Sequence, residues 1–568
     1  MNHKLLRLKT LFKNQPSSVQ RFLTTNPKGY VATNEPVYDF KRNSPEAAQV
    51  HATLKDFLGR KNDTNDALFE VPIVIGDKEI RTENVQYQPI PFDHQTKIAR
   101  FYHADKAILA QAIENSLQNR ADWENSSFDY RASIMLKAAD RITKEGRAEI
   151  LASTMLGQAK TVYQAEIDAA CELADFLRFN VQYLYEHLKY KPLNGDENTI
   201  NNMYLRGMEG FVAAIAPFNF TAISGHLATA PALMGNVVLW KPSDTAVFSS
   251  YLVYKILREC GLPAGVINFV PSAGPDFGET ITSSANLAGV NFTGSVPTFR
   301  WLWKKVGENL ESYRTFPRLA GECGGKNFHL VHESSDIESA AVATVRSAFE
   351  FSGQKCSACS RLYVPESKWP QMKEKMVALL KDLQIDSPLK FETFTSAVID
   401  ERSFDKISNY IEYGKNNNKL ITGGYYNKST GYYVYPTIFE TKDPKDRLMR
   451  EEIFGPVLTV FKYKDSEFDQ VVDLVDTTTP YALTGSIFAK DETVMKNTKL
   501  RLRHACGNLY LNDKSTGSVV NQQPFGGARL SGTNDKPGSP GYLLKWTSPL
   551  SVKESLVPQT TVKHASML

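Results

Sequence analysis

The sequence predicts an α/β protein with a dinucleotide-binding domain of the Rossmann type followed by a second α/β domain. From residue 211, the short apolar runs "GFVAAIAPF", "NVVLWKPS", "GVINFVP" and "AGVNFTGS" alternate with helical stretches such as "SSYLVYKILRECGLP". Alternation of strand and helix favours a parallel sheet with right-handed crossovers. Another α/β stretch runs from about residue 323 to 515. A chain of 568 residues also exceeds one ordinary core, so more than one domain is expected.

The region before this alternation is expected to be helical. Between residues 104 and 190, "ADKAILAQAIENSL", "RASIMLKAADRITK" and "AACELADFLRFNVQYLYEHL" repeat apolar residues every three or four positions. The following "KPLNGDENTINNMYLRG" breaks this pattern with turn residues and then predicts a hairpin strand. The final "VKESLVPQTTVKHASML" indicates an extended polar tail.

Composition and charge exclude two classes of partner. No run approaches 18 apolar residues, so no membrane span is expected. The formal charge of +4 is concentrated in residues 1–34, which hold six Lys and Arg residues and no acid. The remaining chain has 60 basic and 62 acidic residues and gives no electrostatic case for nucleic acid.

The N-terminal stretch "MNHKLLRLKTLFKNQPSSVQRFLTT" is typical of a mitochondrial transit peptide. Leu5, Leu8 and Phe12 recur at helical spacing among basic residues. We therefore expect residues 1–34 to direct the protein to the mitochondrial matrix; a disordered basic tail is the alternative. Six cysteines without a secretory signal indicate a reducing compartment and no disulfide framework.

Two cysteines, Cys356 and Cys359, lie three apart in "FSGQKCSACSR" and allow three interpretations. A zinc site usually needs four ligands, but the other cysteines form no second pair, so no metal is expected. A redox pair usually lies early in a small βαβ unit, whereas this one follows the long helical pattern "ESAAVATVRSAFEFSG". A single nucleophile needs an electropositive environment and a nearby base. Glu322, in the Gly-rich "LAGECGGKN", is a candidate base, although for this residue alone a solvated turn carboxylate is the favoured interpretation.

Glu322 and Cys356, 34 residues apart, resemble the base and nucleophile of the aldehyde dehydrogenase superfamily. The motifs "APFNF", "LWKPSD", "NFTGSVPT", "EEIFGPV" and "PFGGARLSG" follow that family's order over about residues 70–550. The longer stretches "PFNFTAISGHLATAPALMGNVVLWKPSD" and "NDKSTGSVVNQQPFGGARLSGTNDKPG" are similar to one branch. That branch oxidises glutamate γ-semialdehyde, formed from 1-pyrroline-5-carboxylate, to glutamate in proline catabolism.

The resemblance implies the catalytic roles. Cys356 would attack the aldehyde to give a thiohemiacetal and then a thioester, which a water activated by Glu322 would hydrolyse. Asn219 and the backbone N–H of Cys356 would stabilise the oxyanion, while Cys359 would be a bystander.

The resemblance also implies NAD as cofactor, held by Ala216, Lys241, Asp244, Gly294, Ser295, Val296, Pro297, Thr298 and Glu452. Lys241 would reach the ribose hydroxyls, and an acid at position 244 disfavours the extra phosphate of NADP. The stretch from Gly294 to Thr298 opens a helix whose N-terminus can face the pyrophosphate. Phe299 stands where many relatives have a second glycine, so the contacts of this turn with the phosphates can differ from theirs.

For the substrate, the matching residues are Ser357, Gly517, Ser518 and Phe525. Mostly uncharged donors would bind the carboxylate, and Phe525 would pack against the aliphatic stem. By composition alone, a plain turn is the favoured interpretation of "STGS" at 515–518.

The resemblance implies a domain plan. The NAD-binding domain would be 35–322, with 187–210 contributing to a small β oligomerisation flap. The catalytic domain would be 323–515, and 516–568 would supply a return segment, the rest of the flap and a tail. An isolated hairpin is marginal, so a homodimer or higher homo-oligomer is expected. A different semialdehyde dehydrogenase, a CoA-acylating relative and a non-catalytic binding protein remain alternatives.

Overall fold

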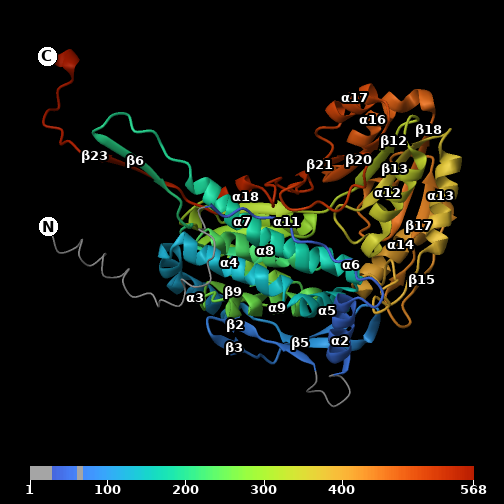
Figure 1. The fold of residues 1–568 in the computed structure, drawn as a ribbon, viewed down its shortest axis with the longest axis horizontal. Coiled ribbons are helices and arrows are strands. Elements are labelled where there is room, and N and C mark those ends of the chain that lie inside the picture. Colours follow the sequence, from blue (N-terminus) through green and yellow to red (C-terminus); the bar gives the residue numbers. More distant parts are fainter. Residues whose placement is uncertain (1–28, 60–67) are drawn as a thin grey trace.

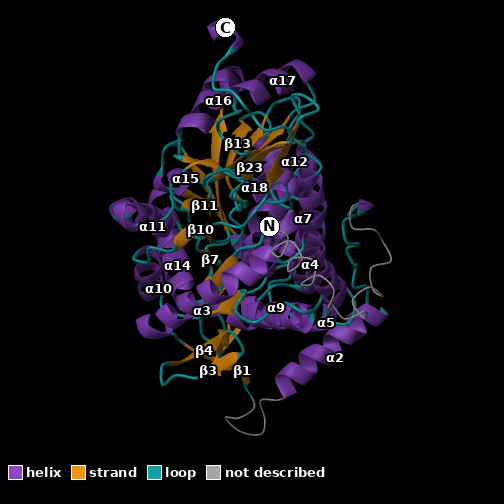
Figure 2. Cartoon of the chain, turned by 90° about the vertical axis from the view of Figure 1, so that its left-hand side faces the viewer, coloured by secondary structure: helices purple, strands orange, loops and turns teal. Residues whose placement is uncertain are grey.

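The structure is a computed structural model that describes residues 29–59 and 68–568. Most of the predicted transit peptide therefore lies outside the described residues. Two seven-stranded sheets dominate the fold, each covered by helices, which confirms the α/β prediction (Figures 1 and 2). Within the described ranges, no helix is both long enough and apolar enough to cross a membrane.

The first sheet has the order β11-β10-β7-β8-β9-β2-β3. Its strands are β2 (Ile73–Ile75), β3 (Lys78–Ile80), β7 (Phe211–Ile215), β8 (Val237–Lys241), β9 (Ile267–Phe269), β10 (Leu287–Thr293) and β11 (Arg318–Glu322). The strands from β7 to β11 are parallel, and β2 and β3 add antiparallel at one edge. The chain runs outward from β7 through β9 and returns to β10 beside β7, which creates a topological switch point there. Ligands of open α/β sheets bind at the carboxyl ends of strands around such a point.

The helices of this half cover both faces of the sheet. They are α3 (Lys106–Asn125), α4 (Phe128–Thr143), α5 (Arg147–Gln158), α6 (Val162–Ala165), α7 (Leu173–Leu188), α8 (Thr221–Leu233), α9 (Val247–Glu259), α10 (Gly274–Thr282) and α11 (Val296–Glu308). The predicted helices at 104–117 and 131–144 correspond to α3 and α4. The predicted helix from residue 169 begins instead as a π-helical segment, η5 (Glu166–Glu172), which continues into α7. Such π segments are rare and frequently mark functional sites.

A small mixed sheet with the strand order β1-β5-β4 precedes these helices in the sequence. It was not predicted from the sequence. It consists of β1 (Phe69–Val71), β4 (Val85–Ile90) and β5 (Asp93–Tyr102). Helix α2 (Pro45–Gly59) packs against α5 on the same side of the molecule (Figure 1).

The second sheet forms a separate lobe with the order β14-β17-β18-β13-β12-β20-β21 (Figure 1). Its strands are β12 (Asn327–Val331), β13 (Cys359–Pro365), β14 (Lys419–Thr422), β17 (Thr437–Thr441), β18 (Val457–Tyr463), β20 (Thr484–Phe488) and β21 (Asn508–Leu511). All are parallel except β14. The helices of this lobe are α12 (Ile337–Phe349), α13 (Trp369–Asp382), α14 (Glu401–Asn417), α15 (Arg447–Arg450), α16 (Phe468–Thr477) and α17 (Glu492–Arg501). Two short pairs, β15 (Tyr426–Asn427) with β16 (Tyr433–Val434) and β19 (Tyr481–Ala482) with β22 (Ala528–Arg529), complete it.

A two-stranded antiparallel ribbon, here called the hairpin although its strands are far apart in the sequence, projects from the body (Figure 1). Strand β6 (Thr199–Tyr204) pairs antiparallel with β23 (Leu550–Ser555) over six residues. The segment before β23 does not belong to this hairpin, because α18 (Pro540–Leu544) packs on α7 and Trp546 is fully buried. The tail predicted from residue 552 is also shorter than expected, since its first residues belong to β23.

Candidate active site

Cys356 lies in a tight loop between a 3₁₀ segment, η8 (Glu350–Gly353), and strand β13. Phe351 and Ser352 have φ of +51° and +52°, a left-handed conformation that non-glycine residues adopt at a cost. Thr395 secures this turn by accepting the N–H of Ser352 at 2.6 Å. The amide of Asn327 donates to the carbonyl oxygens of Cys356 at 2.7 Å and of Ala358 at 2.8 Å. The position of the sulfur is therefore fixed by contacts on both sides of the loop.

Asn219 lies just before helix α8, whose start is anchored by a carboxylate from another element. Asp168 of η5 accepts the N–H groups of Thr221 at 3.0 Å and Ala222 at 2.8 Å, as well as Lys160 Nζ at 2.7 Å. Asn219 Nδ2 donates to the carbonyl oxygen of Gln354 at 3.0 Å, two residues before Cys356. Among the described residues its second hydrogen makes no hydrogen bond, so it is available to an oxyanion near the sulfur.

Glu322 is the last residue of β11, and its carboxylate accepts the N–H of Gly527 at 3.3 Å. Burial raises the pKa of Glu322 well above its usual range, although this N–H and the Lys536 ammonium oppose the shift. A Cβ at Gly526 would come within 3.2 Å of the carboxylate, so glycine keeps the space around it open. A carboxyl group with a raised pKa is a better proton acceptor, as a general base requires.

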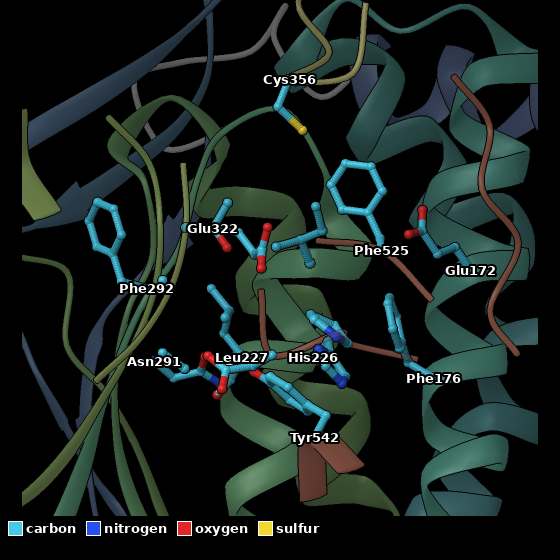
Figure 3. A pocket seen from close by; sticks show the side chains of 16 residues that line it. Glu172, Phe176, His226, Leu227, Asn291, Phe292, Glu322, Cys356, Phe525 and Tyr542 are labelled. Atoms are coloured by element: carbon cyan, nitrogen blue, oxygen red, sulfur yellow. Dashed lines mark hydrogen bonds between the residues drawn. The ribbon is translucent and has the colours of Figure 1, made fainter. Parts of the chain in front are cut away.

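Glu322 and Cys356 line one cavity of about 560 Å³, counting the space open to solvent. Figure 3 shows the sulfur at one end pointing into the cavity, with the Glu322 carboxylate near its middle. The rings of Phe176, His226 and Tyr542 close the other end (Figure 3). Burial lowers the pKa of His226 to about 3, so this imidazole is neutral at physiological pH.

The surroundings of the Cys356 thiol are not electropositive, contrary to the expectation for a reactive cysteine. Burial first, and then the negative charges of Glu322 and Glu452, raise the pKa of Cys356 to about 12. The thiol therefore carries its proton at neutral pH, and its ionisation needs a base or a positive charge brought by a ligand.

Cys359 has a different environment. It opens β13, is 1% exposed, and its thiol donates to the carbonyl oxygen of Arg361 at 3.5 Å. It lines neither cavity that Cys356 lines. In the described part of the chain, no group of three or more His, Cys, Asp and Glu side chains could hold a metal ion.

The four predicted substrate residues come together with the nucleophile in a second pocket. Cys356, Ser357, Gly517, Ser518 and Phe525 all line this space of about 1020 Å³, counting the part open to solvent. Gly517 has φ of +85°, a conformation that favours glycine in this position. The predicted pocket residues are therefore adjacent in space, although 160 residues separate the two groups in the sequence.

Five charged residues of this pocket were missed in the sequence: Glu35, Glu172, Asp175, Lys355 and Lys514. Lys514 Nζ donates to the carbonyl oxygen of Thr516 at 2.8 Å and lies so close to Gly517 that a Cβ there would collide with it. The expectation of mostly uncharged donors is therefore incomplete. Lys355 Nζ is neutralised by Glu350 at 3.0 Å. Burial raises the pKa of Glu172 to about 8, and Glu172 lies in both cavities with Cys356.

The predicted ribose-binding residues follow the carboxyl end of β8. Lys241 ends this strand, and its carbonyl oxygen accepts the N–H of Ala216 at 3.0 Å. Asp244 receives a hydrogen bond of 3.0 Å from His103 Nε2 on one carboxylate oxygen. Its other oxygen, Oδ1, is buried without a partner among the described residues. Asp244 therefore places this buried acceptor beyond the carboxyl end of β8, the strand beside β7 of the switch point.

The predicted phosphate-binding turn opens α11, whose N-cap is Ser295. Ser295 Oγ accepts the N–H of Thr298 at 3.3 Å, and the other residues of the turn that lead into this first helical turn are Gly294, Val296 and Pro297. Phe299 does not face the open end of the helix. Its ring stacks on Phe292 at 5.3 Å and occupies the space beside Gly321, where a Cβ would collide with it.

Glu452 lies against the two glycines that follow Glu322. Its Oε1 accepts the N–H of Gly325 at 2.9 Å, and a Cβ at Gly324 would collide with its carboxylate. Burial raises the pKa of Glu452. The start of α11 and the Asp244 oxygen follow the carboxyl ends of β10 and β8, and Glu452 contacts the glycines that follow β11. This is the edge of an open α/β sheet at which ligands bind.

We expect the cofactor-free Cys356 thiol to react slowly with iodoacetamide at neutral pH. Its alkylation rate should rise about tenfold per pH unit from pH 7 to 10 without a plateau, because its pKa is raised to about 12. Glu322→Gln removes a negative neighbour, so it should lower the thiol pKa and speed alkylation at each pH. Mass spectrometry of the Cys356 peptide gives the rates, with Cys359→Ser as control; a wild-type plateau near pH 8 would contradict this electrostatic account.

Comparison with known proteins places this site in a family. The aldehyde dehydrogenase family model matches residues 81–552. The mitochondrial delta-1-pyrroline-5-carboxylate dehydrogenase of Danio rerio is 54% identical over 94% of this chain and 95% of that protein. The corresponding protein of Bos taurus is 56% identical over 92% of each chain. The crystal structure of the Mycobacterium tuberculosis Delta-pyrroline-5-carboxylate dehydrogenase bound with NAD has a TM-score of 0.90 at 41% identity, covering 95% of this chain and 98% of that one. With a match over most of its length and the motifs gathered at one site, the chain belongs to the aldehyde dehydrogenase family.

Proposed function

We propose that this protein is an NAD-dependent aldehyde dehydrogenase that oxidises glutamate γ-semialdehyde, formed from 1-pyrroline-5-carboxylate, to glutamate in proline catabolism. The observation that carries this function is the placement of Cys356 between two cavities. One holds the Glu322 carboxylate, and the other holds Ser357, Gly517 and Ser518, the donors expected for a substrate carboxylate. Similar proteins of several organisms are named delta-1-pyrroline-5-carboxylate dehydrogenase.

In the proposed mechanism, the Cys356 sulfur attacks the aldehyde carbon and forms a thiohemiacetal. Asn219 Nδ2 and the N–H of Cys356 hold the oxygen that becomes negative. NAD, when bound, supplies the hydride acceptor that converts this adduct to a thioester. Glu322 then takes a proton from a water that attacks the thioester, and glutamate leaves while Cys356 regains its thiol. The raised pKa of Glu322 suits this step, because the carboxylate must hold the proton briefly.

The residues that would hold NAD are Ala216, Lys241, Asp244, the turn from Gly294 to Thr298, and Glu452. Asp244 supports NAD over NADP, because its carboxylate would repel a 2′-phosphate. His103 keeps this carboxylate in place through the hydrogen bond of 3.0 Å. Two solved structures of similar proteins, from Mycobacterium tuberculosis and Thermus, are described as bound with NAD.

The substrate would lie with its α-carboxylate on the loop at Gly517 and Ser518, where the Lys514 ammonium adds a charged donor. Its α-ammonium group would face Glu172, whose buried carboxyl lies in the same pocket. A cation beside Glu172 would lower the pKa of this carboxyl from about 8 and favour its charged form. Phe525 would cover the aliphatic stem between the two ends.

Substitutions at Cys356 and Glu322 should block different steps. Cys356→Ser should abolish NADH formation, because a hydroxyl is a poorer nucleophile than a thiolate at this site. Glu322→Gln should lower steady turnover by about 10²–10⁴-fold while a single burst of NADH per site survives, because only hydrolysis needs the base. Rapid-mixing absorbance at 340 nm measures both. Cys359→Ser should retain most activity, and the reverse pattern for the two cysteines would identify Cys359 as the nucleophile.

The carboxylate-binding loop should give the enzyme its substrate preference. Wild type should prefer glutamate γ-semialdehyde to propionaldehyde by orders of magnitude in kcat/KM, because the neutral aldehyde leaves buried donors unpaired. Ser518→Ala should raise KM for the semialdehyde about tenfold or more and hardly change propionaldehyde turnover.

The same assay separates the alternatives. Preference for another semialdehyde, a requirement for CoA, or the absence of NADH formation would favour a different dehydrogenase, a CoA-acylating enzyme or a non-catalytic protein, respectively.

We propose that the protein assembles as a homodimer or a larger homo-oligomer through the β6–β23 hairpin. The hairpin projects from the body, and Ile200, Tyr204 and Leu550 on it are exposed. A two-stranded hairpin without a third strand is marginal in water, so a second copy would stabilise it. The flap would then be narrower than the predicted segments 187–210 and 516–568, and centred on β6 and β23.

Charge on this hairpin should therefore reduce the oligomer to a monomer. Ile200→Asp combined with Tyr204→Asp should shift the mass measured by light scattering towards that of one chain, 63.6 kDa for the full sequence. Val85→Asp, at an exposed apolar residue of β4 outside the hairpin, should leave the mass unchanged. An unaltered mass for the double variant would exclude the hairpin as the main contact.

The protein is mitochondrial by its similarity to proteins named mitochondrial, and we propose that it resides in the matrix. Residues 1–34 were predicted as the transit peptide, but Ala32 is already buried against the body. We therefore propose cleavage on the N-terminal side of residue 29.

A reporter fused behind residues 1–34 should enter the matrix, and the protein without residues 1–28 should stay in the cytosol. Protease protection in isolated mitochondria after swelling of the outer membrane measures this. A full-length chain that remains cytosolic would refute the assignment.

A further inference from the structure

Residues 30–38, here called the N-terminal strap, form part of the wall of the substrate pocket. Asn34, Glu35 and Val37 line this pocket together with Gly517 and Ser518. We propose that Asn34 is a positioning residue that fixes the substrate-carboxylate loop and thereby sets the preference for carboxylate-bearing aldehydes. This inference rests on the proposed function, because it assumes that residues 514–522, here called the carboxylate loop, bind the substrate.

Asn34 uses all of its polar atoms at this junction. Its Nδ2 donates to Asp175 Oδ2 at 2.8 Å and to the carbonyl oxygen of Val520 at 3.0 Å. Its Oδ1 accepts from Gln522 Nε2 at 3.0 Å. The side chain therefore joins α7, through Asp175, to two residues of the carboxylate loop.

The strap itself is rigidly attached. Asp175 also accepts the N–H of Glu35 at 2.7 Å, and the Glu35 carboxylate binds Arg147 at 2.7 Å and Arg178 at 2.5 Å. At its two ends, Ala32 N–H donates to Gln182 Oε1 at 2.8 Å, and Tyr38 N–H donates to Glu166 Oε1 at 2.9 Å. A strap held at five points on α5, η5 and α7 can act as a fixed wall for the carboxylate loop.

The carboxylate loop lacks regular structure and depends on contacts from outside. Residues 514–519 are neither helix nor strand, and Gly517 adds backbone freedom. Ser515 Oγ ties the start of the loop to the carbonyl oxygen of Ser357 at 3.2 Å. Tyr183 donates to Asn521 Oδ1 at 2.7 Å, after the binding residues. Asn34 is thus the strap residue that holds the backbone at Val520, two residues beyond Ser518.

A loop that is held before binding costs less entropy when it closes on a ligand. Loss of the Asn34 contacts should therefore weaken binding of the substrate carboxylate and leave the thiol chemistry intact. The effect should appear in KM for glutamate γ-semialdehyde, while a neutral aldehyde that does not use the loop should be unaffected.

Asn34→Asp tests this proposal with a side chain of nearly the same shape. It removes both donated hydrogen bonds and places a second carboxylate beside Asp175. We expect KM for glutamate γ-semialdehyde to rise about tenfold, with less than about a twofold change in kcat and in kcat/KM for propionaldehyde. Hydrogen exchange measured by mass spectrometry should become faster in the peptides that cover residues 514–522. Val31→Ala, at an exposed strap residue that faces away from these contacts, is the matched control.

The double variant Asn34→Asp with Asp175→Asn separates positioning from simple loss of structure. It exchanges donor and acceptor between the strap and α7, so it should recover the thermal midpoint of wild type. It still leaves the Val520 carbonyl oxygen without its donor, so KM and the exchange of residues 514–522 should stay raised. Full recovery of KM in the double variant, or equal losses for both aldehydes in Asn34→Asp, would overturn the proposal.

The same measurements distinguish failure of the strap proposal from failure of the proposed function. If wild type does not prefer the carboxylate-bearing aldehyde, the proposed function fails at once, before any variant is compared. If that preference holds but Asn34→Asp changes neither KM nor the exchange of residues 514–522, the strap proposal alone fails.

Discussion

The active site depends on one buried ion pair, Lys160 with Asp168, which joins three elements that are far apart in the sequence. Asp168 anchors the first N–H groups of α8, and the Lys160 ammonium lies over the rings of Phe220 at 3.9 Å and Phe351 at 4.7 Å. Phe220 follows the predicted oxyanion donor, and Phe351 begins the turn that leads to the nucleophile. Both charges are almost fully buried, which is costly unless each is fully bonded. The pair therefore links the segment that carries the oxyanion donor to the turn that carries the nucleophile.

The electrostatics of the site favour the protonated, less reactive form of the nucleophilic thiol before a ligand binds. Burial raises the pKa of both the Cys356 thiol and the Glu322 carboxyl, and the Glu322 charge raises the thiol pKa further. A neutral thiol resists oxidation and alkylation better than a thiolate. Reactivity is then coupled to ligand binding, because only an arriving positive charge or a proton acceptor can ionise Cys356 in this setting. The same burial would strengthen every hydrogen bond made to a developing oxyanion.

The sequence alone predicted the α/β class, the helices α3 and α4, and the strands β7, β8, β9 and β10. The pattern of apolar residues that marks each of these elements is local in the sequence. The predicted nucleophile, base and substrate residues line two cavities that share Cys356, since ordered motifs such as "ECGGKN" and "STGS" carry their geometry with them. The small sheet of β1, β4 and β5 was missed because its pairing joins short segments with no distinctive pattern. Glu172 and Lys514 were missed because a charged residue in a helical or turn pattern looks solvated. Asn34 could not be found at all, since its contact with Val520 spans 486 residues.

The packing of Phe299 against Gly321 has a consequence for how this sequence can change over evolution. The phenylalanine ring fills the space that any side chain at position 321 would need. Position 321 lies one residue before the candidate base, on the strand that carries it. A change from glycine at 321 therefore becomes tolerable only in a background where position 299 has already become small. The two positions form a size-compensating pair, so the order in which their substitutions arise decides whether intermediates keep a working site.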